Sequence, residues 1–190
     1  MPIKTRLAVA AITLLLSAVT PWVSHAAQTD MPAAARDSSR DLDFLRGSPW
    51  HVHNRQLPKR LAGSHDWVEF DATDEFIALP GNLGNEEHYR TDHWKDFVSV
   101  AFQLYNPKTR QWNEYFVENR SAPGVLQPPV TGGFTGDVGH FEGQDTYAGK
   151  PITVRTTWRR LGPNHVTWEQ AFSPDGGKSW ETNWTMDFTR

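Results

Sequence analysis

From residue 41 onward, apolar and polar residues alternate in short runs, and clusters of Gly, Pro, Asn and Asp separate the runs. A period of two residues is typical of strands with one buried face, and such clusters are typical of turns. Only residues 41–45 predict a helical turn, with Ser38 or Ser39 as its cap. The pattern predicts ten or eleven strands, at 50–56, 66–72, 75–79, 86–91, 97–105, 112–119, 133–137, 140–147, 152–161, 165–173 and 180–189.

Short connections join these predicted strands, which indicates an all-β fold, either a barrel or a sandwich. No connection is long enough for the crossover that parallel strands need, so we expect antiparallel pairing. We favour an antiparallel up-and-down β-barrel of about ten strands, spanning residues 41–190.

The last three predicted strands also predict a register. A turn at residues 162–164 places Leu161 opposite His165 and Trp158 opposite Trp168. A slip of one residue would move every ring to the other face, so the apolar residues fix this register. The predicted inner face comprises Ile152, Val154, Trp158, Val166, Trp168, Phe172, Trp180, Thr182, Trp184, Met186 and Phe188.

Residues 1–26 have the features of a secretory signal peptide, with Lys4 and Arg6 ahead of an apolar run at 7–19. We expect cleavage between Ala26 and Ala27, and a flexible leader over residues 27–40. The apolar run is shorter than the ~20 residues that cross a bilayer, and no later run could span one. The expected location is therefore the periplasm or the cell exterior.

Composition removes several functional classes. The chain has no cysteine, which excludes disulfides, thiolate metal ligands and a cysteine nucleophile. Its formal net charge of −3 argues against nucleic-acid binding, which needs clustered Lys and Arg. Aromatic residues make up 12% of the chain, which is enough to build a core and argues against wholesale disorder.

Residues 173–180, Ser-Pro-Asp-Gly-Gly-Lys-Ser-Trp, resemble the Asp-box hairpins of sialidase-type propellers. The Asp carboxylate can accept backbone N–H groups inside such a turn, and the glycines allow positive φ. A propeller needs one repeat per blade, and only one copy is present. We therefore expect a structural turn.

His51 and His53 lie on one face of a predicted strand, because side chains alternate along a strand. Two imidazoles at this spacing can supply two metal ligands. The alternative to a metal site is that both histidines belong to a polar outer face, which Arg55 continues. Apart from this possible metal ion, we expect no cofactor. Further metal ligands would come from His65, Glu69, His88, His93 or His140.

Four glutamates are candidates for an acid/base pair, whose chemistry depends on the separation of the carboxyl groups. The alternative is that they face solvent in salt bridges with arginines. The chain has no G-x-S-x-G motif and no phosphate-binding glycine loop. The glutamates are Glu69, Glu114, Glu118 and Glu169, and the possible partners are Arg120, Arg155 and Arg159.

The inner-face rings predict the wall of an apolar pocket, because a barrel of this size can hold one small ligand. Gln170, and Asn54 beside Val52, would lie among the rings, where a buried polar group needs a hydrogen-bond partner. The alternative is plain core packing. The predicted ligand-binding residues are Asn54, Trp158, Trp168, Gln170, Phe172 and Trp184.

Motifs spread over residues 41–190 carry a family resemblance. They include Asp43-Phe44-Leu45 with Gly47, Trp67-x-Glu69-Phe70, Trp168-Glu169-Gln170-Ala171-Phe172-Ser173 and Glu181-Thr182-Asn183-Trp184. These motifs resemble a bacterial family of exported proteins defined by a domain of unknown function. The resemblance implies a shared fold and no particular activity.

The first strand and the last residue also resemble the calycins, which are lipocalin-like barrels. In calycins a short helix precedes Gly-x-Trp on the first strand, and a basic residue of the last strand packs over that Trp. Here Gly47-Ser48-Pro49-Trp50 carries one additional residue, and Arg190 would be the basic partner. We predict that Arg190 stacks on Trp50 and closes the barrel base, which contributes roughly 0.5–2 kcal/mol.

Three functions remain open at this stage. The first is an exported barrel that binds a small apolar molecule. The second is a calycin-like enzyme, either a cyclase or isomerase working in a dry cavity or a metal-dependent enzyme using His51 and His53. The third is a structural envelope protein, which a filled barrel with an exposed apolar patch would favour.

Overall fold

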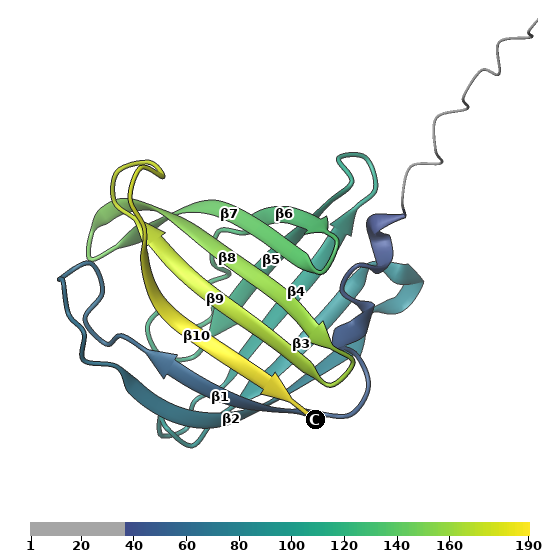
Figure 1. The fold of residues 1–190 in the computed structure, drawn as a ribbon, viewed down its shortest axis with the longest axis horizontal. Helices are drawn as coiled ribbons and strands as arrows, with labels where there is room; N and C mark the ends of the chain where they lie inside the picture. Colours follow the sequence, from purple (N-terminus) through teal and green to yellow (C-terminus); the bar gives the residue numbers. More distant parts are fainter. Residues whose placement is uncertain (1–36) are drawn as a thin grey trace, which may run out of the picture. The chain divides into compact units, whose positions relative to one another are not determined.

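A computed structural model describes residues 37–190, which form a closed barrel of ten antiparallel strands (Figure 1). Strands consecutive in sequence pair with each other, and β1 pairs with β10 to close the sheet. The predicted all-β up-and-down barrel is confirmed. The strands are β1 (Trp50–Gln56), β2 (Val68–Ala78), β3 (Gly84–Arg90), β4 (Ser99–Asn106), β5 (Gln111–Glu118), β6 (Val130–Thr135), β7 (Val138–Tyr147), β8 (Lys150–Gly162), β9 (His165–Ser173) and β10 (Glu181–Thr189).

The two strands predicted at 66–72 and 75–79 are one continuous strand, β2. The polar run from Asp71 to Glu75 suggests a break, but its side chains keep a period of two. Ala72 and Asp74 are buried, whereas Asp71 and Thr73 are exposed. The strand continues because a polar side chain, Asp74, takes an inward position that the sequence pattern leaves unassigned.

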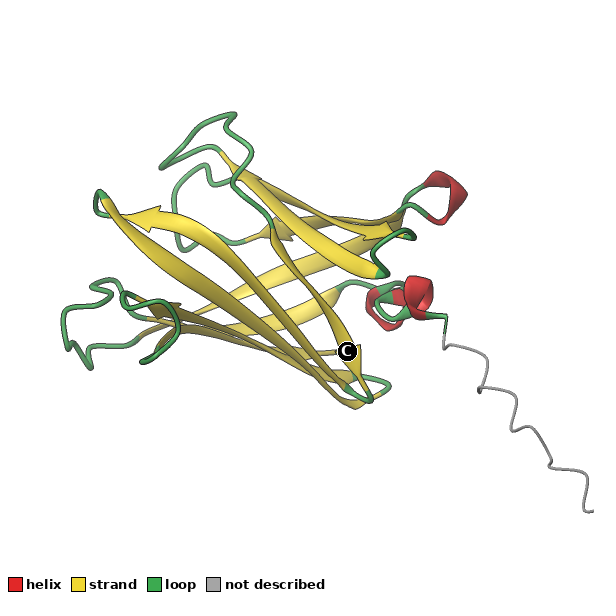
Figure 2. Cartoon of the chain, turned by 90° about the horizontal axis from the view of Figure 1, so that it is seen from above, coloured by secondary structure: helices red, strands yellow, loops and turns green. Residues whose placement is uncertain are grey.

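Short helical turns lie at one end of the barrel, as Figure 2 shows. Two 3-10 turns, η1 (Ser38–Arg40) and η2 (Asp43–Leu45), precede β1, and η3 (Pro80–Asn82) connects β2 to β3. The turn predicted at 41–45 corresponds to η2, but its predicted serine cap is wrong, because Leu42 is the N-cap and makes no side-chain cap hydrogen bond. Asp37 caps η1 by accepting the backbone N–H of Ser39 at 3.0 Å. We call this end the base.

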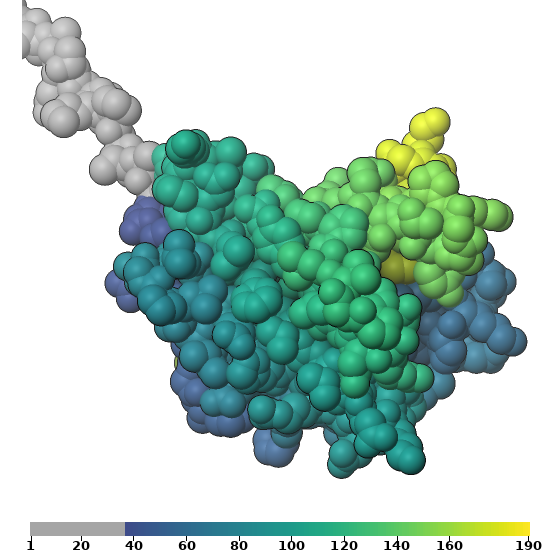
Figure 3. Space-filling view, turned by 180° about the vertical axis from the view of Figure 1, so that it is seen from behind, coloured from purple at the N-terminus to yellow at the C-terminus, as the bar shows by residue number. Residues whose placement is uncertain are grey.

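The opposite end of the barrel carries longer loops, and we call it the loop end. Seen from behind (Figure 3), the 57–67 loop in blue, the β7–β8 turn in green and the 174–180 hairpin in yellow gather away from the purple segment before β1. The two ends of the barrel are therefore built differently.

The segment before β1 is bonded to the barrel wall. Trp112 Nε1 donates to the carbonyl oxygen of Ser38 at 2.8 Å, and Trp50 Nε1 donates to that of Leu45 at 2.8 Å. Leu42 and Leu45 are fully buried. Residues 38–40, which the sequence assigns to the leader, thus belong to the barrel domain, and residues 27–36 of the leader lie outside the described part of the chain.

Arg190 closes the base as predicted. Its guanidinium carbon lies 3.9 Å from the centroid of the Trp50 ring. The same guanidinium donates to the carbonyl oxygens of Phe44 at 3.2 Å, Arg46 at 3.0 Å and Ser48 at 3.2 Å. One side chain therefore joins the last strand, the first strand and the segment between η2 and β1.

The main hydrophobic core contains Leu42 and Leu45, which pack against inward-facing rings at the base. The partly buried rings of Trp94, Trp168 and Trp184 pack against the same core. A second, smaller cluster lies toward the loop end and contains Ile152, Val154 and Phe172, with Leu61 packed against it. The fully buried large residues of the base are Trp50, Trp112, Phe141, Val166 and Phe188.

The predicted register of β8 and β9 is confirmed at its centre, where Trp158 pairs with Trp168. It is wrong at the turn, because Gly162 rather than Leu161 pairs with His165. A β-bulge at Leu161 adds one residue on that side and leaves its side chain 58% exposed.

A second bulge in β10 changes which residues face inward. Thr182 pairs with Ala171 and Trp184 with Gln170, so Asn183 is the extra residue. Trp184 keeps its predicted inward position, but the inward positions predicted for Trp180 and Thr182 are wrong because the bulge reverses the alternation before it. Trp180 packs outside the barrel, with the Arg155 guanidinium carbon 3.7 Å from its ring centroid.

The hairpin at 173–180 has the predicted structural role. Asp175 Oδ1 accepts the backbone N–H of Lys178 at 3.0 Å and of Ser179 at 2.9 Å. Gly176 and Gly177 both have positive φ, at 69° and 89°. Hydrogen bonds from Ser179 and its neighbours hold the pKa of Asp175 well below its ordinary value.

Within residues 37–190, no helix is long and apolar enough to cross a membrane. The predicted signal peptide and the cleavage site between Ala26 and Ala27 lie outside the described residues.

Candidate functional site

Acidic side chains line the lumen, the space that the barrel wall encloses. Asp74 on β2, Glu87 on β3 and Glu114 on β5 occupy inward positions in the alternation of their strands. Their inward-facing neighbours along the strands are mostly apolar, such as Phe76 beside Asp74 and Trp112 beside Glu114. Burying carboxyl groups among rings is costly unless they are neutral or bonded, so their partners decide what this site can do.

Asp74 and Glu87 form a pair that shares one proton. Their carboxyl groups lie close enough for a side-chain hydrogen bond, which forms when one of them is protonated. Burial, together with the charge of Glu87, raises the pKa of Asp74 well above its ordinary value, so Asp74 holds the proton. Burial raises the pKa of Glu87 to about 7, although hydrogen bonds from Asp74 and Gln103 oppose this rise.

The surroundings of this pair contain acceptors that lack donors. Gln103 Nε2 donates to Glu87 Oε2 at 2.5 Å. Besides the proton shared with Glu87, the one donor to Asp74 among the described residues is the backbone N–H of Glu75. No group among these residues donates to Gln103 Oε1. Asp74 and Gln103 are each only 1% exposed. Buried acceptors without donors are rare and indicate a site that a donor from outside the chain can complete.

Glu114 bridges the lumen. Its Oε1 accepts the indole N–H of Trp158 at 2.7 Å, and its Oε2 accepts the hydroxyl of Thr156 at 3.0 Å. These donors come from β8, which is not a neighbour of β5, so the bonds cross the interior. Burial raises the pKa of Glu114 to about 7, the two donors oppose the rise, and the charge of Glu87 adds to it. Glu87 and Glu114 are therefore close enough to influence each other.

Inward-facing side chains toward the loop end keep accessible surface. Glu87 and Glu114 lie deep in the molecule, yet both are only partly buried. The wall is closed, so this surface must face space inside the lumen or at its open end. The lumen is thus packed at the base and less filled toward the loop end, where the partly buried inward residues include Phe116, Trp168, Gln170 and Trp184.

Asn54 is the centre of a hydrogen-bond network. Its Oδ1 accepts from Tyr89 Oη at 3.0 Å and from Trp184 Nε1 at 3.0 Å. Its Nδ2 donates to the carbonyl oxygen of Val52 at 3.2 Å, and its side chain is fully buried. The partners that the sequence leaves open for Asn54 are therefore supplied by the protein, and they hold the Trp184 ring in place.

Three predicted pocket residues form a column of rings along the lumen. The ring centroids of Trp158 and Trp168 are 6.4 Å apart, and those of Trp168 and Trp184 are 5.8 Å apart. Trp94, from the loop at 91–98, continues the column at 6.2 Å from Trp184. These edge-to-face contacts favour a rigid aromatic wall.

The other two predicted pocket residues lie nearby. Gln170 Nε2 donates to Asn183 Oδ1 at 2.9 Å. Phe172 belongs to the smaller cluster, and the guanidinium carbon of Arg60 lies 5.3 Å from its ring and 5.9 Å from that of Trp184. All six predicted residues therefore face inward, with Asn54 buried deepest.

The two histidines predicted as metal ligands lie on the outer face of β1 and are exposed. His53 Nδ1 is 3.0 Å from Asp71 Oδ1, and His51 pairs along the sheet with Thr73. Among residues 37–190, no group of three or more His, Asp or Glu side chains is arranged to hold a metal ion.

Of the four glutamates considered for acid/base chemistry, only Glu114 lies in the lumen. Glu69 and Glu169 are exposed on the outer face, where Glu69 Oε1 accepts from Arg55 Nε at 3.0 Å. Partial burial acts to raise the pKa of Glu118, but hydrogen bonds from Ser121 and from backbone N–H groups lower it. Glu118 thus orders the loop after β5.

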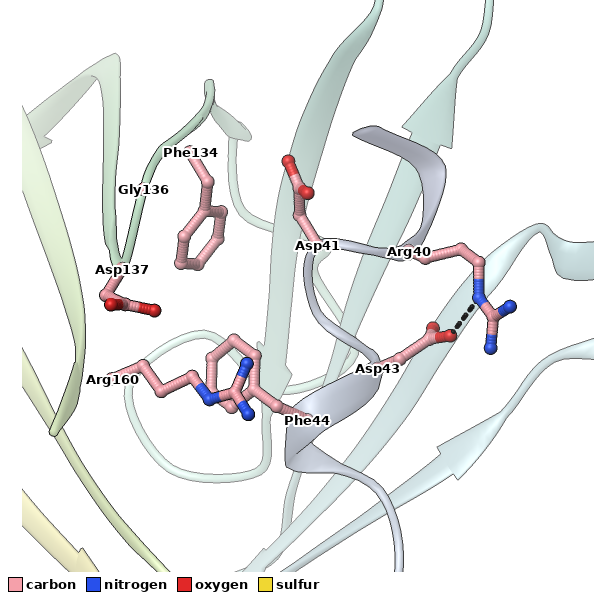
Figure 4. Close-up of a pocket in the computed structure, with 8 residues that line it drawn as sticks. All are labelled: Arg40, Asp41, Asp43, Phe44, Phe134, Gly136, Asp137 and Arg160. Carbon is pink, nitrogen blue, oxygen red and sulfur yellow. Dashed lines mark hydrogen bonds and ion pairs between the residues drawn. The ribbon is translucent and has the colours of Figure 1, made fainter. Parts of the chain in front are cut away.

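A surface cleft of about 440 Å³ lies outside the base, between the segment before β1 and the β6–β7 turn (Figure 4). Its charges are largely compensated, because Asp43 pairs with Arg40 at 2.8 Å and with Arg46 at 2.7 Å. The Arg160 guanidinium carbon is 5.6 Å from the Phe44 ring. We place the candidate site in the lumen instead, where acidic groups lack such partners.

Sequence reasoning missed Asp74 and Glu87 as site residues. Each continues the inward alternation of its strand, Asp74 after Phe70 and Ala72, and Glu87 between Asn85 and Tyr89. The sequence signal was therefore a polar residue at a position where the period-two pattern predicts an apolar one. Asp74 and Glu87 are missed when the inner face is assigned from apolar residues alone.

No family model matches the chain, and no curated protein matches it. The family and calycin resemblances therefore rest on motifs and on the confirmed Arg190–Trp50 contact.

Proposed function

We propose that the protein binds a small, mostly apolar molecule in the loop-end half of its barrel, as an exported carrier. The observation that carries this proposal is the set of inward-facing residues that stay partly accessible, Trp168, Gln170 and Trp184. Rings that served only as core would be buried, as Trp50, Trp112 and Phe188 are at the base. A lumen filled along its whole length would favour a structural role instead.

The aromatic column supplies the affinity in this proposal. Each 100 Å² of apolar surface that a ligand buries contributes about 2.5 kcal/mol. The rings of Trp168 and Trp184 are fixed by contacts at 5.8 Å and by the bond from Trp184 to Asn54, so little ordering is needed on binding. Gln170, held by Asn183, can orient a polar group of the ligand.

The proposal is tested with N-phenyl-1-naphthylamine, a probe whose fluorescence rises in apolar surroundings. Trp184→Ala should weaken probe binding at least tenfold while far-UV circular dichroism stays unchanged, because Asn54 keeps its bond from Tyr89. Trp180→Ala is the matched control, since Trp180 packs outside the barrel, and it should bind like the wild type. Equal loss in both variants, or loss of fold and binding together, would show that the rings are only core.

A second candidate is an enzyme that moves protons on a ligand held in the lumen. The proton-sharing pair Asp74–Glu87, with Glu114 nearby, favours it, because raised carboxyl pKa values suit general acid–base catalysis near neutral pH. The test is deuterium incorporation from D₂O into 2-tetralone, an apolar ketone with an acidic α-proton, followed by NMR. Exchange that is equal in the wild type and in Glu87→Gln would remove this candidate.

A further inference from the structure

The lumen has an uneven distribution of charge. Three carboxyl groups, those of Asp74, Glu87 and Glu114, lie inside it. Their hydrogen-bond donors among the described residues are neutral: a side-chain amide, an indole, a hydroxyl and the backbone N–H of Glu75. The charge of Arg90 acts to lower the pKa of Asp74, but no Lys or Arg of the described chain forms an ion pair with any of the three.

The buried polar atoms around these acids that lack hydrogen-bond partners are acceptors. Oε1 of Gln103 is buried without a donor, and Asp74 has only the shared proton and the backbone N–H of Glu75 as donors among the described residues. Both side chains point into the interior and are 1% exposed. A ligand that completes this site must therefore bring donors, and an ammonium group brings three donors and no acceptor.

The acids hold protons in place of a cation when no ligand is bound. Burial raises the pKa values of Glu87 and Glu114 to about 7 and that of Asp74 well above its ordinary range. A carboxyl group that takes up a proton for want of a partner becomes a carboxylate when a positive charge arrives. A cationic ligand therefore exchanges for protons, whereas an anionic one is repelled.

The aromatic rings that line the lumen near these acids also favour binding of a positive charge. Aromatic faces attract cations, and tryptophan does so most strongly. The chain itself places a cation here, because the Arg60 guanidinium carbon lies 5.3 Å from the Phe172 ring and 5.9 Å from the Trp184 ring. Trp158 joins the two features, since its indole N–H bonds Glu114 while its ring packs 6.4 Å from that of Trp168.

We propose that the lumen selects an organic cation, an apolar or aromatic group that carries a protonated amine, with the ammonium directed at Glu87 and Glu114. This inference rests on the proposed function, since it assigns the charge of the molecule that the barrel binds. Glu114 and Glu87 are its charge-selecting residues, and Asp74 and Gln103 supply the acceptors behind them.

The test compares three probes of similar shape and different charge: phenethylamine, 2-phenylethanol and 3-phenylpropanoate. Binding is measured at pH 7.5 by isothermal titration calorimetry and by the tryptophan fluorescence of the full domain. We expect phenethylamine to bind at least tenfold more tightly than the alcohol, and the carboxylate to bind most weakly.

Variants assign the preference to the lumen. Glu114→Gln should reduce the preference for phenethylamine over the alcohol at least fivefold, through weaker binding of the amine. Glu169→Gln, which removes an exposed carboxylate on the outer face, is the matched control and should keep the preference. If Glu114→Gln does not fold, Glu87→Gln serves the same purpose.

The outcomes separate this inference from the proposed function. Equal binding of the three probes, or a preference that survives both glutamine variants, overturns the cation inference and leaves the carrier proposal standing. The same conclusion follows if N-phenyl-1-naphthylamine binds and none of the three probes does. If that neutral probe also fails to bind, both proposals are wrong.

Discussion

Replacing Glu114 by Gln should make the stability of the protein less dependent on pH. The folded chain holds a proton on Glu114 up to a pKa of about 7, whereas the unfolded chain releases it near 4.5. A group whose pKa is raised by folding contributes stability below its unfolded pKa, and this contribution is lost as the pH rises toward the folded value. Stability from Glu114 is thus greatest below pH 4.5 and declines up to about pH 7.

The size of the effect follows from the two pKa values. The difference between 4.5 and about 7 corresponds to about 3 kcal/mol in the free energy of unfolding. Gln keeps an oxygen that can accept the Trp158 N–H and has no proton to lose, so Glu114→Gln should lack this decline. The stability of the variant minus that of the wild type should therefore be larger at pH 7.5 than at pH 5.

Urea unfolding at pH 5, 6, 7 and 8, followed by circular dichroism, measures this difference. Taking the wild type minus the variant cancels the contributions of the titrating groups that Glu114 does not influence; Glu87 is influenced by it and remains part of the difference. Glu169→Gln, on the outer face, should leave the pH profile unchanged. Parallel profiles for the wild type and Glu114→Gln would refute the assignment of Glu114 as a buried, proton-holding group.

Three further predictions concern stability. Arg190→Met keeps an aliphatic stem but loses the cation on Trp50 and three carbonyl contacts, and should cost about 2 kcal/mol in urea unfolding; an unchanged midpoint would contradict the closure of the base. Gly132→Ala should lower the free energy of unfolding by about 3 kcal/mol or more, because the added Cβ would lie 1.8 Å from the carbonyl oxygen of His140. In the control Gly133→Ala the added Cβ meets nothing within 4 Å, so this variant should melt like the wild type. Tyr89→Phe should cost about 1 kcal/mol, since it removes one of two donors to Asn54, and a thermal melt identical to the wild type would argue against the network.

The fold was largely predictable because each wall strand carries its own period-two pattern. β1 and β9 have the bounds that the sequence predicts, and the Trp158–Trp168 pair follows from a single turn. The errors lie at bulges. An extra residue at Asn183 reverses the inward and outward faces before it, and nothing in the local pattern marks that position.

The candidate site was predictable only in its apolar half. Trp168 and Trp184 follow from alternation, and so does the inward position of Asn54. The acidic half depends on contacts between strands far apart in the chain, such as the bond from Trp158 on β8 to Glu114 on β5. The sequence places a carboxyl group on a strand, but only the closed barrel brings it to an indole across the interior.

The joining of β1 to β10 has a consequence for how the chain folds. Hairpins between consecutive strands form from local contacts, but this last pairing connects residues about 130 positions apart, such as Arg55 and Thr185. Contacts at such separation form late and slow the folding reaction. We therefore expect a late intermediate with nine hairpin pairings made and the edges of the first and last strands still exposed, a species prone to pair with its own copies before Arg190 reaches Trp50.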